Sequence, residues 1–196
     1  MKLIQKLGLM AFAFLLSGCG SNSIGMKENE YTDLLVGPYS VLLPTNSLGN
    51  VSIIGSENRG LALAFNRKDR DSQRIISISV LDKSHLGYEM DMRKFPRLVL
   101  RLEEPTLDLG LSEKAIEGIH NIWKDFVEGR RTKVIKIGGG HAYLAIDEEK
   151  QRIIAYLTAD NYPRELNFIS THGISEKQLQ ELVLDNLYLN RLPLEK

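Results

Sequence analysis

A pattern of short β-rich runs constrains the fold of this chain more than any other feature of its sequence. The runs have five to eight residues, are rich in Val, Ile, Leu and aromatic side chains, and are separated by segments that hold Gly, Asn, Pro or charged residues. They fall into two groups of four, and the short connections within each group favour antiparallel pairing. The runs are YSVLLP (39–44), NVSII (50–54), LALAF (61–65), RIISISVL (74–81), TKVIKI (132–137), HAYLAI (141–146), RIIAYLT (152–158) and ELNFIST (165–171).

Residues 113–128 have the period of an amphipathic helix. Ser112 can cap the first turn, and Leu111 is placed to contact Ile116 across the cap. Gly129 suits the position that follows the last turn of a helix. Apolar residues recur every three or four positions, which predicts one stripe packed on a sheet. The stripe consists of Ala115, Ile116, Ile119, Ile122, Trp123 and Phe126.

A second helix is predicted to begin after Ser175. Gln178 completes a capping box with Ser175, and Ile174 is placed to contact Leu179. These signals together mark the start of a helix near the end of the chain. The expected inner face of this helix consists of Leu179, Leu182, Val183 and Leu187.

The order of these elements predicts a single α+β domain over residues 34–196, with antiparallel sheets and two amphipathic helices packed on them. Residues 88–102 are ambiguous, because Pro96 disfavours a helix there and LVLRL (98–102) has the composition of a strand. Three segments, YSVLLP, IKIGGGHAYLAI and LNFISTHGISEKQLQELVLDNL, resemble the Mog1/PsbP-like sandwich. That resemblance covers residues 39–189, implies the same fold, and carries no catalytic residue.

The front of the chain has the three parts of a secretory signal peptide over residues 1–18. Lys2 and Lys6 give a positive start, LGLMAFAFLL (7–16) is apolar, and small residues precede Cys19, the chain's single cysteine. A helix of ten apolar residues reaches roughly 15 Å, about half of a ~30 Å hydrocarbon core. The run is therefore too short for a stable transmembrane helix.

Leu16, Ser17, Gly18 and Cys19 resemble the lipobox of bacterial lipoproteins. The resemblance implies cleavage before Cys19, a diacylglycerol on its sulfur, and a fatty acid such as palmitate on its new amino group. Stable anchoring needs two or more acyl chains, and this modification supplies them. Gly20, in place of the aspartate that retains family members in the inner membrane, implies the outer membrane, facing the periplasm. The alternatives are an ordinary signal peptide with an incidental cysteine, or a small buried thiol.

The composition of the mature chain argues against a nucleic-acid partner. Removal of residues 1–18 leaves 23 basic and 25 acidic side chains, a net charge of −2. Residues 19–33 lack periodicity and are expected to form a tether between the lipidated cysteine and the body. Gly138, Gly139 and Gly140 lack the Lys-Ser/Thr of a phosphate loop, so they predict a turn or bulge with positive φ or a close backbone approach, and no cofactor is expected.

Four basic residues close together in EGRRTKVIK are candidate contacts: Arg130, Arg131, Lys133 and Lys136. They suggest contact with anionic headgroups or an acidic partner, or the solvated border of an edge strand. The chain has neither a Gly-x-Ser-x-Gly elbow nor an HExxH motif, so the sequence supports neither a serine nucleophile nor a metal site. If the last strands form a meander, His141 and His172 lie at opposite ends of the sheet, about 20 Å apart at 3.3 Å per residue.

Two functions are compatible with these features. The first is a non-enzymatic envelope lipoprotein, anchored in the membrane by its lipid, whose body binds another protein or supports an envelope assembly. VGPYSVLLP and GGGHAYLAI also resemble the lipoprotein immunity proteins of type VI secretion phospholipase effectors, which implies occlusion of a periplasmic toxin. The alternative is a small hydrolase or ligand carrier whose site is assembled from scattered residues such as His141, His172 and Asp160.

The lipobox gives a first prediction, tested with Cys19→Ala in the full chain. We expect the wild-type protein to have the intact mass of residues 19–196 plus fatty acids, because the thiol is the acceptor that licenses cleavage. The variant should keep its leader and incorporate no labelled palmitate. Globomycin, which blocks the lipoprotein signal peptidase, should make the wild-type protein accumulate as the precursor. A wild-type mass without fatty acids would contradict the prediction.

Overall fold

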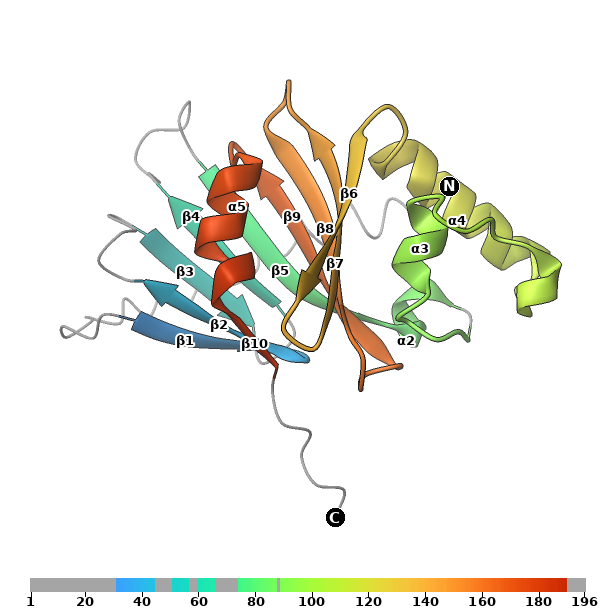
Figure 1. The fold of residues 1–196 in the computed structure, drawn as a ribbon, viewed down its shortest axis with the longest axis horizontal. Coiled ribbons are helices and arrows are strands. Elements are labelled where there is room, and N and C mark those ends of the chain that lie inside the picture. The colour runs from blue at the N-terminus through green and yellow to red at the C-terminus, as the bar shows by residue number, and fades with distance from the viewer. Residues whose placement is uncertain (1–30, 45–50, 57–59, 66–73, 88, 190–196) are drawn as a thin grey trace, which may run out of the picture.

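The computed structural model describes residues 31–44, 51–56, 60–65, 74–87 and 89–189, which form two antiparallel sheets and several helices (Figure 1). The larger sheet has the strand order β3-β4-β5-β9-β8-β7-β6 and the smaller one β1-β2-β10. The strands are β1 (Tyr31–Val36), β2 (Tyr39–Pro44), β3 (Val51–Ser56), β4 (Gly60–Phe65), β5 (Arg74–Asp82), β6 (Arg131–Ile137), β7 (Gly140–Asp147), β8 (Arg152–Ala159), β9 (Glu165–His172) and β10 (Leu187–Leu189). The helices are α2 (Lys83–Leu86), α3 (Phe95–Val99), η2 (Leu107–Leu109), α4 (Glu113–Phe126), α5 (Glu176–Leu182) and η3 (Leu184–Asn186).

The structure confirms the α+β class and the antiparallel pairing. All eight β-rich runs contain a strand, and every pair of neighbouring strands in the described residues is antiparallel. The sequence pattern predicts neither β1 nor β10. β1 begins at Tyr31, inside the segment 19–33 that is expected to be a tether. The expectation that Leu187 belongs to the last helix is wrong, because it pairs with Val41 of β2.

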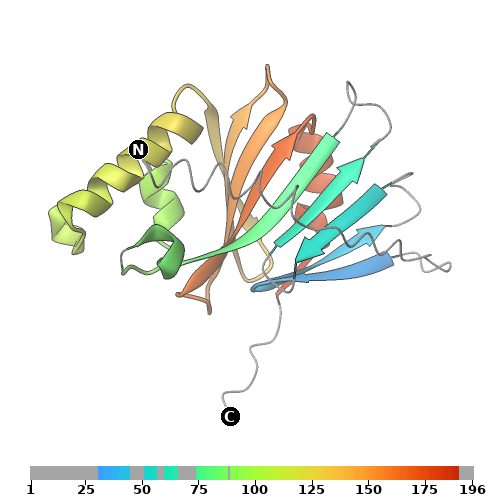
Figure 2. The same ribbon diagram turned by 180° about the vertical axis from the view of Figure 1, so that it is seen from behind.

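Each face of the larger sheet has its own core, because side chains alternate along every strand. On β8, Ile153 and Ala155 belong to one core, and Ile154 and Tyr156 belong to the other. The smaller sheet and α5 cover the first core, whereas α2, α3 and α4 cover the second (Figures 1 and 2). Strands β7 to β9 of the large sheet therefore lie between two layers, with the smaller sheet and α5 on one face and the helices α2, α3 and α4 on the other.

The helix predicted over residues 113–128 is α4, and its cap is confirmed. The Ser112 hydroxyl accepts a hydrogen bond from the backbone N–H of Ala115 at 3.2 Å. Ala115, Ile119 and Ile122 are buried in the second core, so the apolar stripe packs on the sheet as expected.

The ambiguous segment 88–102 contains a short helix, α3, over residues 95–99, and the strand considered for residues 98–102 does not form. Pro96 lies in the first turn of this helix, where the backbone N–H that proline lacks would have no partner within the helix. Phe95 and Leu98 are buried in the second core, and the Phe95 ring meets Tyr156 edge-on at 5.7 Å between centroids. Burial of this short apolar segment therefore overrides its strand-like composition.

The three glycines between β6 and β7 form a tight turn, as the sequence predicts. Gly139 has φ +76°, and a Cβ on Gly140 would lie 1.8 Å from the backbone oxygen of Thr158. The same oxygen accepts a hydrogen bond from the Tyr39 hydroxyl at 2.9 Å, which joins the two sheets. Burial raises the pKa of that hydroxyl, so it stays protonated and donates this hydrogen bond throughout the physiological pH range.

The close approach at Gly140 gives the second prediction. Gly140→Ala should lower the free energy of unfolding by about 3 kcal/mol or more, because β7 and β8 would have to separate to admit the methyl group. Gly138→Ala is the matched control, since its Cβ would meet no atom closer than 4.0 Å, and it should change stability by less than about 0.5 kcal/mol. Urea unfolding followed by circular dichroism measures both. Equal midpoints for the two variants would contradict the packing described here.

Candidate functional site

A surface cleft of about 670 Å³ lies between α5 and the β6–β7–β8 side of the large sheet. Buried apolar side chains lie at its base, and charged or amide side chains from β6, the β7–β8 turn and α5 line its walls. The base consists of Ile146, Ile153 and Ile174, and the polar walls include Lys133, Asp147, Glu148, Gln151, Glu176, Lys177, Gln180, Glu181 and Asp185. The cleft is therefore polar at its rim and apolar underneath.

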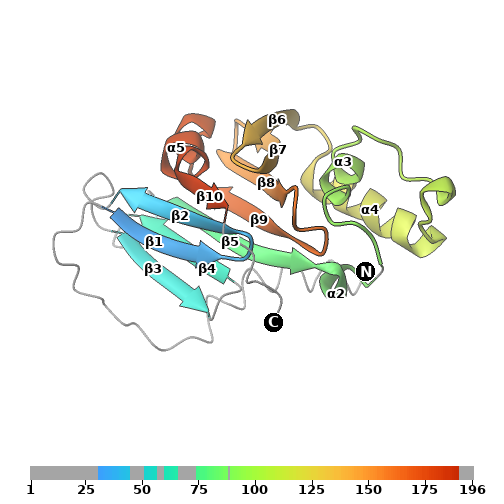
Figure 3. The same cartoon turned by 60° about the horizontal axis from the view of Figure 1, so that its bottom comes forward.

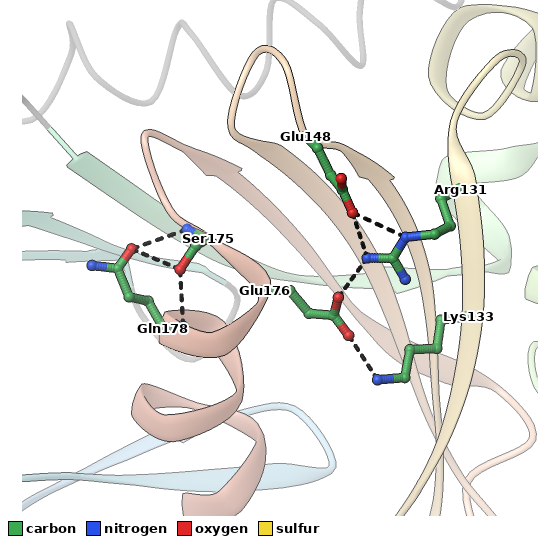
Figure 4. Close-up of polar contacts among 6 residues, drawn as sticks. All are labelled: Arg131, Lys133, Glu148, Ser175, Glu176 and Gln178. Atoms are coloured by element: carbon green, nitrogen blue, oxygen red, sulfur yellow. Dashed lines mark hydrogen bonds and ion pairs between the residues drawn. The ribbon is translucent and has the colours of Figure 1, made fainter.

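Ion pairs across the cleft connect β6 with α5 and the β7–β8 turn (Figure 4). Arg131 donates to Glu148 at 2.8 Å and to Glu176 at 2.6 Å through the same Nη2 atom. Lys133 donates to the other oxygen of Glu176 at 2.7 Å. These hydrogen bonds, that of Lys133 first and that of Arg131 next, hold the pKa of the Glu176 carboxyl below its usual value.

Local structure explains why these three charges meet. Side chains two residues apart on a strand point to the same face, so Arg131 and Lys133 both reach over the first core toward α5. Glu176 is the first residue of α5, and the capping box predicted for Ser175 and Gln178 is present. The Ser175 hydroxyl accepts from the Gln178 backbone N–H at 3.3 Å, and the Gln178 side chain accepts from the Ser175 N–H at 3.0 Å. The cap therefore fixes the orientation in which Glu176 faces β6.

The four basic residues proposed as one contact surface do not share a face. Arg131 and Lys133 lie on the face of β6 toward α5, whereas Lys136 pairs in register with His141 on the other face. Arg130 precedes the strand, donates to the Phe126 carbonyl oxygen and lies 3.9 Å from an Asp147 carboxylate oxygen. The period of two along a strand separates side chains that are adjacent in the sequence. Three of the four cations are therefore paired within the protein itself.

The histidines and Asp160 are not brought together into one site. His141 pairs with Thr158 on β8 at one end of the meander, while His172 ends β9 at the other, opposite Ile75 of β5. The Asp160 backbone N–H donates to the carbonyl of Gly139, which places Asp160 at the His141 end. The separation of His141 and His172 follows the predicted meander.

Sequence reasoning missed Glu148 and Glu176, the carboxylates that pair with the basic residues of β6. The capping box locates Glu176 at the start of α5, but a contact across 43 positions of the chain has no signal in the local pattern. Leu16, Ser17, Gly18 and Cys19 lie outside the described residues. The cleft is a concave surface whose walls carry polar side chains and ion pairs. Such a surface is suited to contact with a polar segment of another molecule.

Neither a protein-family model nor a curated protein matches this chain. Among the helices of the described residues, none combines the length and the apolar character needed to cross a bilayer. Within the same ranges, no group of three or more His, Cys, Asp or Glu side chains is arranged to hold a metal ion.

The ion pairs of Glu176 give the third prediction, tested with Glu176→Gln. The pKa of Glu176 is lower in the folded state, so its pairs stabilise the fold above roughly pH 4.3 and lose this effect as the pH falls through the lower folded value. The variant should be less stable than the wild-type protein at pH 7 by less than about 1 kcal/mol, because the pairs are partly exposed. This difference should vanish toward about pH 2.

Urea titrations across this pH range measure the effect, with Glu149→Gln as the control. Glu149 is exposed and has no ion-pair partner among the described side chains, so its replacement should leave the unfolding midpoint unchanged at every pH. A gap between Glu176→Gln and the wild-type protein that persists in acid would show that the ion pairs do not cause it.

Proposed function

We propose that this chain is a lipoprotein of the bacterial cell envelope, anchored by lipid on Cys19, whose α+β body binds another protein and performs no catalysis. The observation that carries the proposal is the sequence Leu16-Ser17-Gly18-Cys19 ahead of a well-formed body. Eleven residues separate Cys19 from Tyr31, where β1 begins, and this length spans at most about 40 Å. Gly20 supports placement in the outer membrane with the body in the periplasm.

Charge and side-chain placement support a binding role over the alternatives. The mature chain has a net charge of −2, which disfavours a nucleic-acid partner. Arg130, Arg131 and Lys133 are occupied by carboxylates of the protein itself, which disfavours their use for anionic lipid headgroups. A hydrolytic site assembled from His141 and His172 would need the two side chains near one another, whereas the β9–β8–β7 meander places them at opposite ends of the sheet.

A sharper form of the proposal is immunity, in which the body blocks the active site of a periplasmic toxin by steric and electrostatic occlusion. It is supported by the resemblance of VGPYSVLLP and GGGHAYLAI to lipoprotein immunity proteins of type VI secretion. The fold proposed with it is the Mog1/PsbP-like sandwich, which agrees with antiparallel sheets that carry helices on both faces.

The second candidate function is a carrier of a small polar ligand, and one observation favours it. The cleft beside α5 has a volume within the range of ligand sites, roughly 300–1,000 Å³. Its walls are mostly charged, however, whereas ligand pockets are predominantly apolar. The cleft therefore fits a polar segment of a partner better than it fits a drug-like ligand.

The fourth prediction tests partner binding in the envelope of the source organism. The full lipoprotein with a C-terminal affinity tag, extracted in mild detergent after reversible crosslinking, should retain one other envelope protein in a fixed ratio. The Cys19→Ala variant should lose this partner if the partner is itself in the outer membrane, because the anchor raises the local concentration of the two. Recovery of no stoichiometric protein, together with saturable binding of a small ligand, would favour the carrier instead.

The immunity hypothesis is tested separately, with strains of the source organism that have or lack the chain. Cells that lack the chain should be outcompeted by their wild-type siblings in surface contact and not in liquid culture, since toxin delivery needs contact. Re-expression of the lipoprotein should restore survival. Equal survival of the two strains on a surface would exclude immunity while leaving other protein partners open to the crosslinking experiment.

A further inference from the structure

Three leucines are exposed in one segment between α3 and α4. Leu102 is 45 % exposed, Leu107 59 % and Leu109 41 %, although each belongs to a residue type that normally lies in the core. Seven large apolar side chains of the described residues are exposed, and three of them fall within these eight positions. We call residues 100–112, which join the two helices, the α3–α4 loop (Figure 3).

The loop is held in a defined conformation, so the exposure of the leucines does not come from a loose chain. The backbone N–H of Leu102 donates to the carbonyl of Arg97 at 2.8 Å. Leu100 and Leu111 at the two ends of the loop are buried in the second core, and Pro105 between them is also buried. A surface ordered before a partner arrives loses less conformational entropy on binding.

Side-chain contacts of Arg101 hold the start of the loop against α4. Its backbone has φ +56°, an unfavourable region for a residue other than glycine. Its guanidinium lies 5.2 Å from the ring centroid of Trp123, donates to Nδ1 of His120 at 2.7 Å, and donates to Glu104 at 3.0 Å. Strained residues that are maintained by such contacts concentrate at functional surfaces.

The sequence around the three leucines is acidic. Residues 101–117 hold five carboxylates and two cations. Two of these carboxylates are paired, Glu103 with Arg97 and Glu104 with Arg101. Asp108 lies between two of the leucines, and Glu113 and Glu117 follow on the first two turns of α4. Within the described part of the chain, these three carboxylates have no ion-pair partner. The segment thus combines exposed apolar side chains with a net negative charge.

The α3–α4 loop also lies far from the start of β1. Figure 1 has the longest axis of the molecule horizontal, with the start of β1 at one end and the loop between α3 and α4 at the other, and Figure 3 gives the same separation. The lipidated cysteine precedes β1, so an anchored molecule can present this loop away from the bilayer.

We infer that the α3–α4 loop is a docking surface for a protein that presents apolar side chains flanked by lysine or arginine. The inference rests on the proposed function, since it names the surface and the partner chemistry of the same binding role. An anionic bilayer would repel the three carboxylates that have no ion-pair partner within the described residues. A second copy that docked through the same loop would bring Asp108, Glu113 and Glu117 against their own counterparts. A basic protein surface complements the charge and covers the leucines.

The fifth prediction tests this surface by photocrosslinking in intact cells. The full lipoprotein carries p-benzoylphenylalanine in place of Leu107, and a matched control carries it in place of Leu35 on β1, which is 55 % exposed. We expect residue 107 to give one crosslinked protein whose attached peptide, identified by mass spectrometry, is flanked by Lys or Arg. Residue 35 should give less than about a tenth of that product.

Two variants test the chemistry of the contact. Asp108→Lys with Glu113→Lys should lower crosslinking from residue 107 about tenfold or more by placing like charges against the partner. Leu109→Ser should lower it to a similar extent, and an unchanged melting temperature would exclude unfolding as the cause. Unchanged crosslinking in both variants would overturn the inference.

The remaining outcomes separate this inference from the proposed function. Crosslinking of residue 107 to lipid, to a second copy of the chain, or to a protein segment without basic residues would overturn the inference. A partner crosslinked at residue 35 and not at 107 would overturn it while partner binding itself stands. If no stoichiometric protein is recovered with either probe or with the tagged chain, both the inference and the proposed function fail.

Discussion

Burial of both faces of the central strands is the constraint on which the rest of this structure depends. Six of the eight residues of β7 and seven of the eight of β8 are buried. Strands of this kind need a covering layer on each side, because alternate side chains point in opposite directions. The smaller sheet with α5 supplies one layer, and α2, α3 and α4 supply the other. The glycine turn before β7 and the Tyr39 hydrogen bond then join the smaller sheet to this centre.

Polar contacts at the margin of the core position the second layer and shape the surface. Arg131 and Lys133 reach from the edge strand β6 to Glu176, so the start of α5 is held over the first core. The same pairs form one wall of the cleft beside α5. Ion pairs at such a partly exposed site contribute little stability individually. Their larger effect is to fix the position of Glu176 and Lys133 in the wall of the cleft.

The candidate contact residues could be predicted only in part. The sequence identifies Arg130, Arg131, Lys133 and Lys136 as a basic group, and the edge-strand interpretation describes the position of the last three on β6 correctly. Their partners could not be foreseen, because Glu176 lies 45 positions away from Arg131 and approaches it only when α5 packs on the sheet. The exposure of the leucines in the α3–α4 loop could not be predicted either, because the sequence does not distinguish the exposed Leu107 from the buried Leu111.

By itself the sequence determined the local structure: eight strand-forming runs, the Ser112 cap, the Ser175–Gln178 capping box and the glycine turn. These features depend on alternation, on helical period and on hydrogen bonds between residues at most four positions apart. Tertiary structure alone decided that Leu187 joins β2, that residues 95–99 form a helix, and that Arg131 meets Glu176. Each of these outcomes is decided by contacts between distant segments, and their free energy exceeds the weak local preferences of the chain.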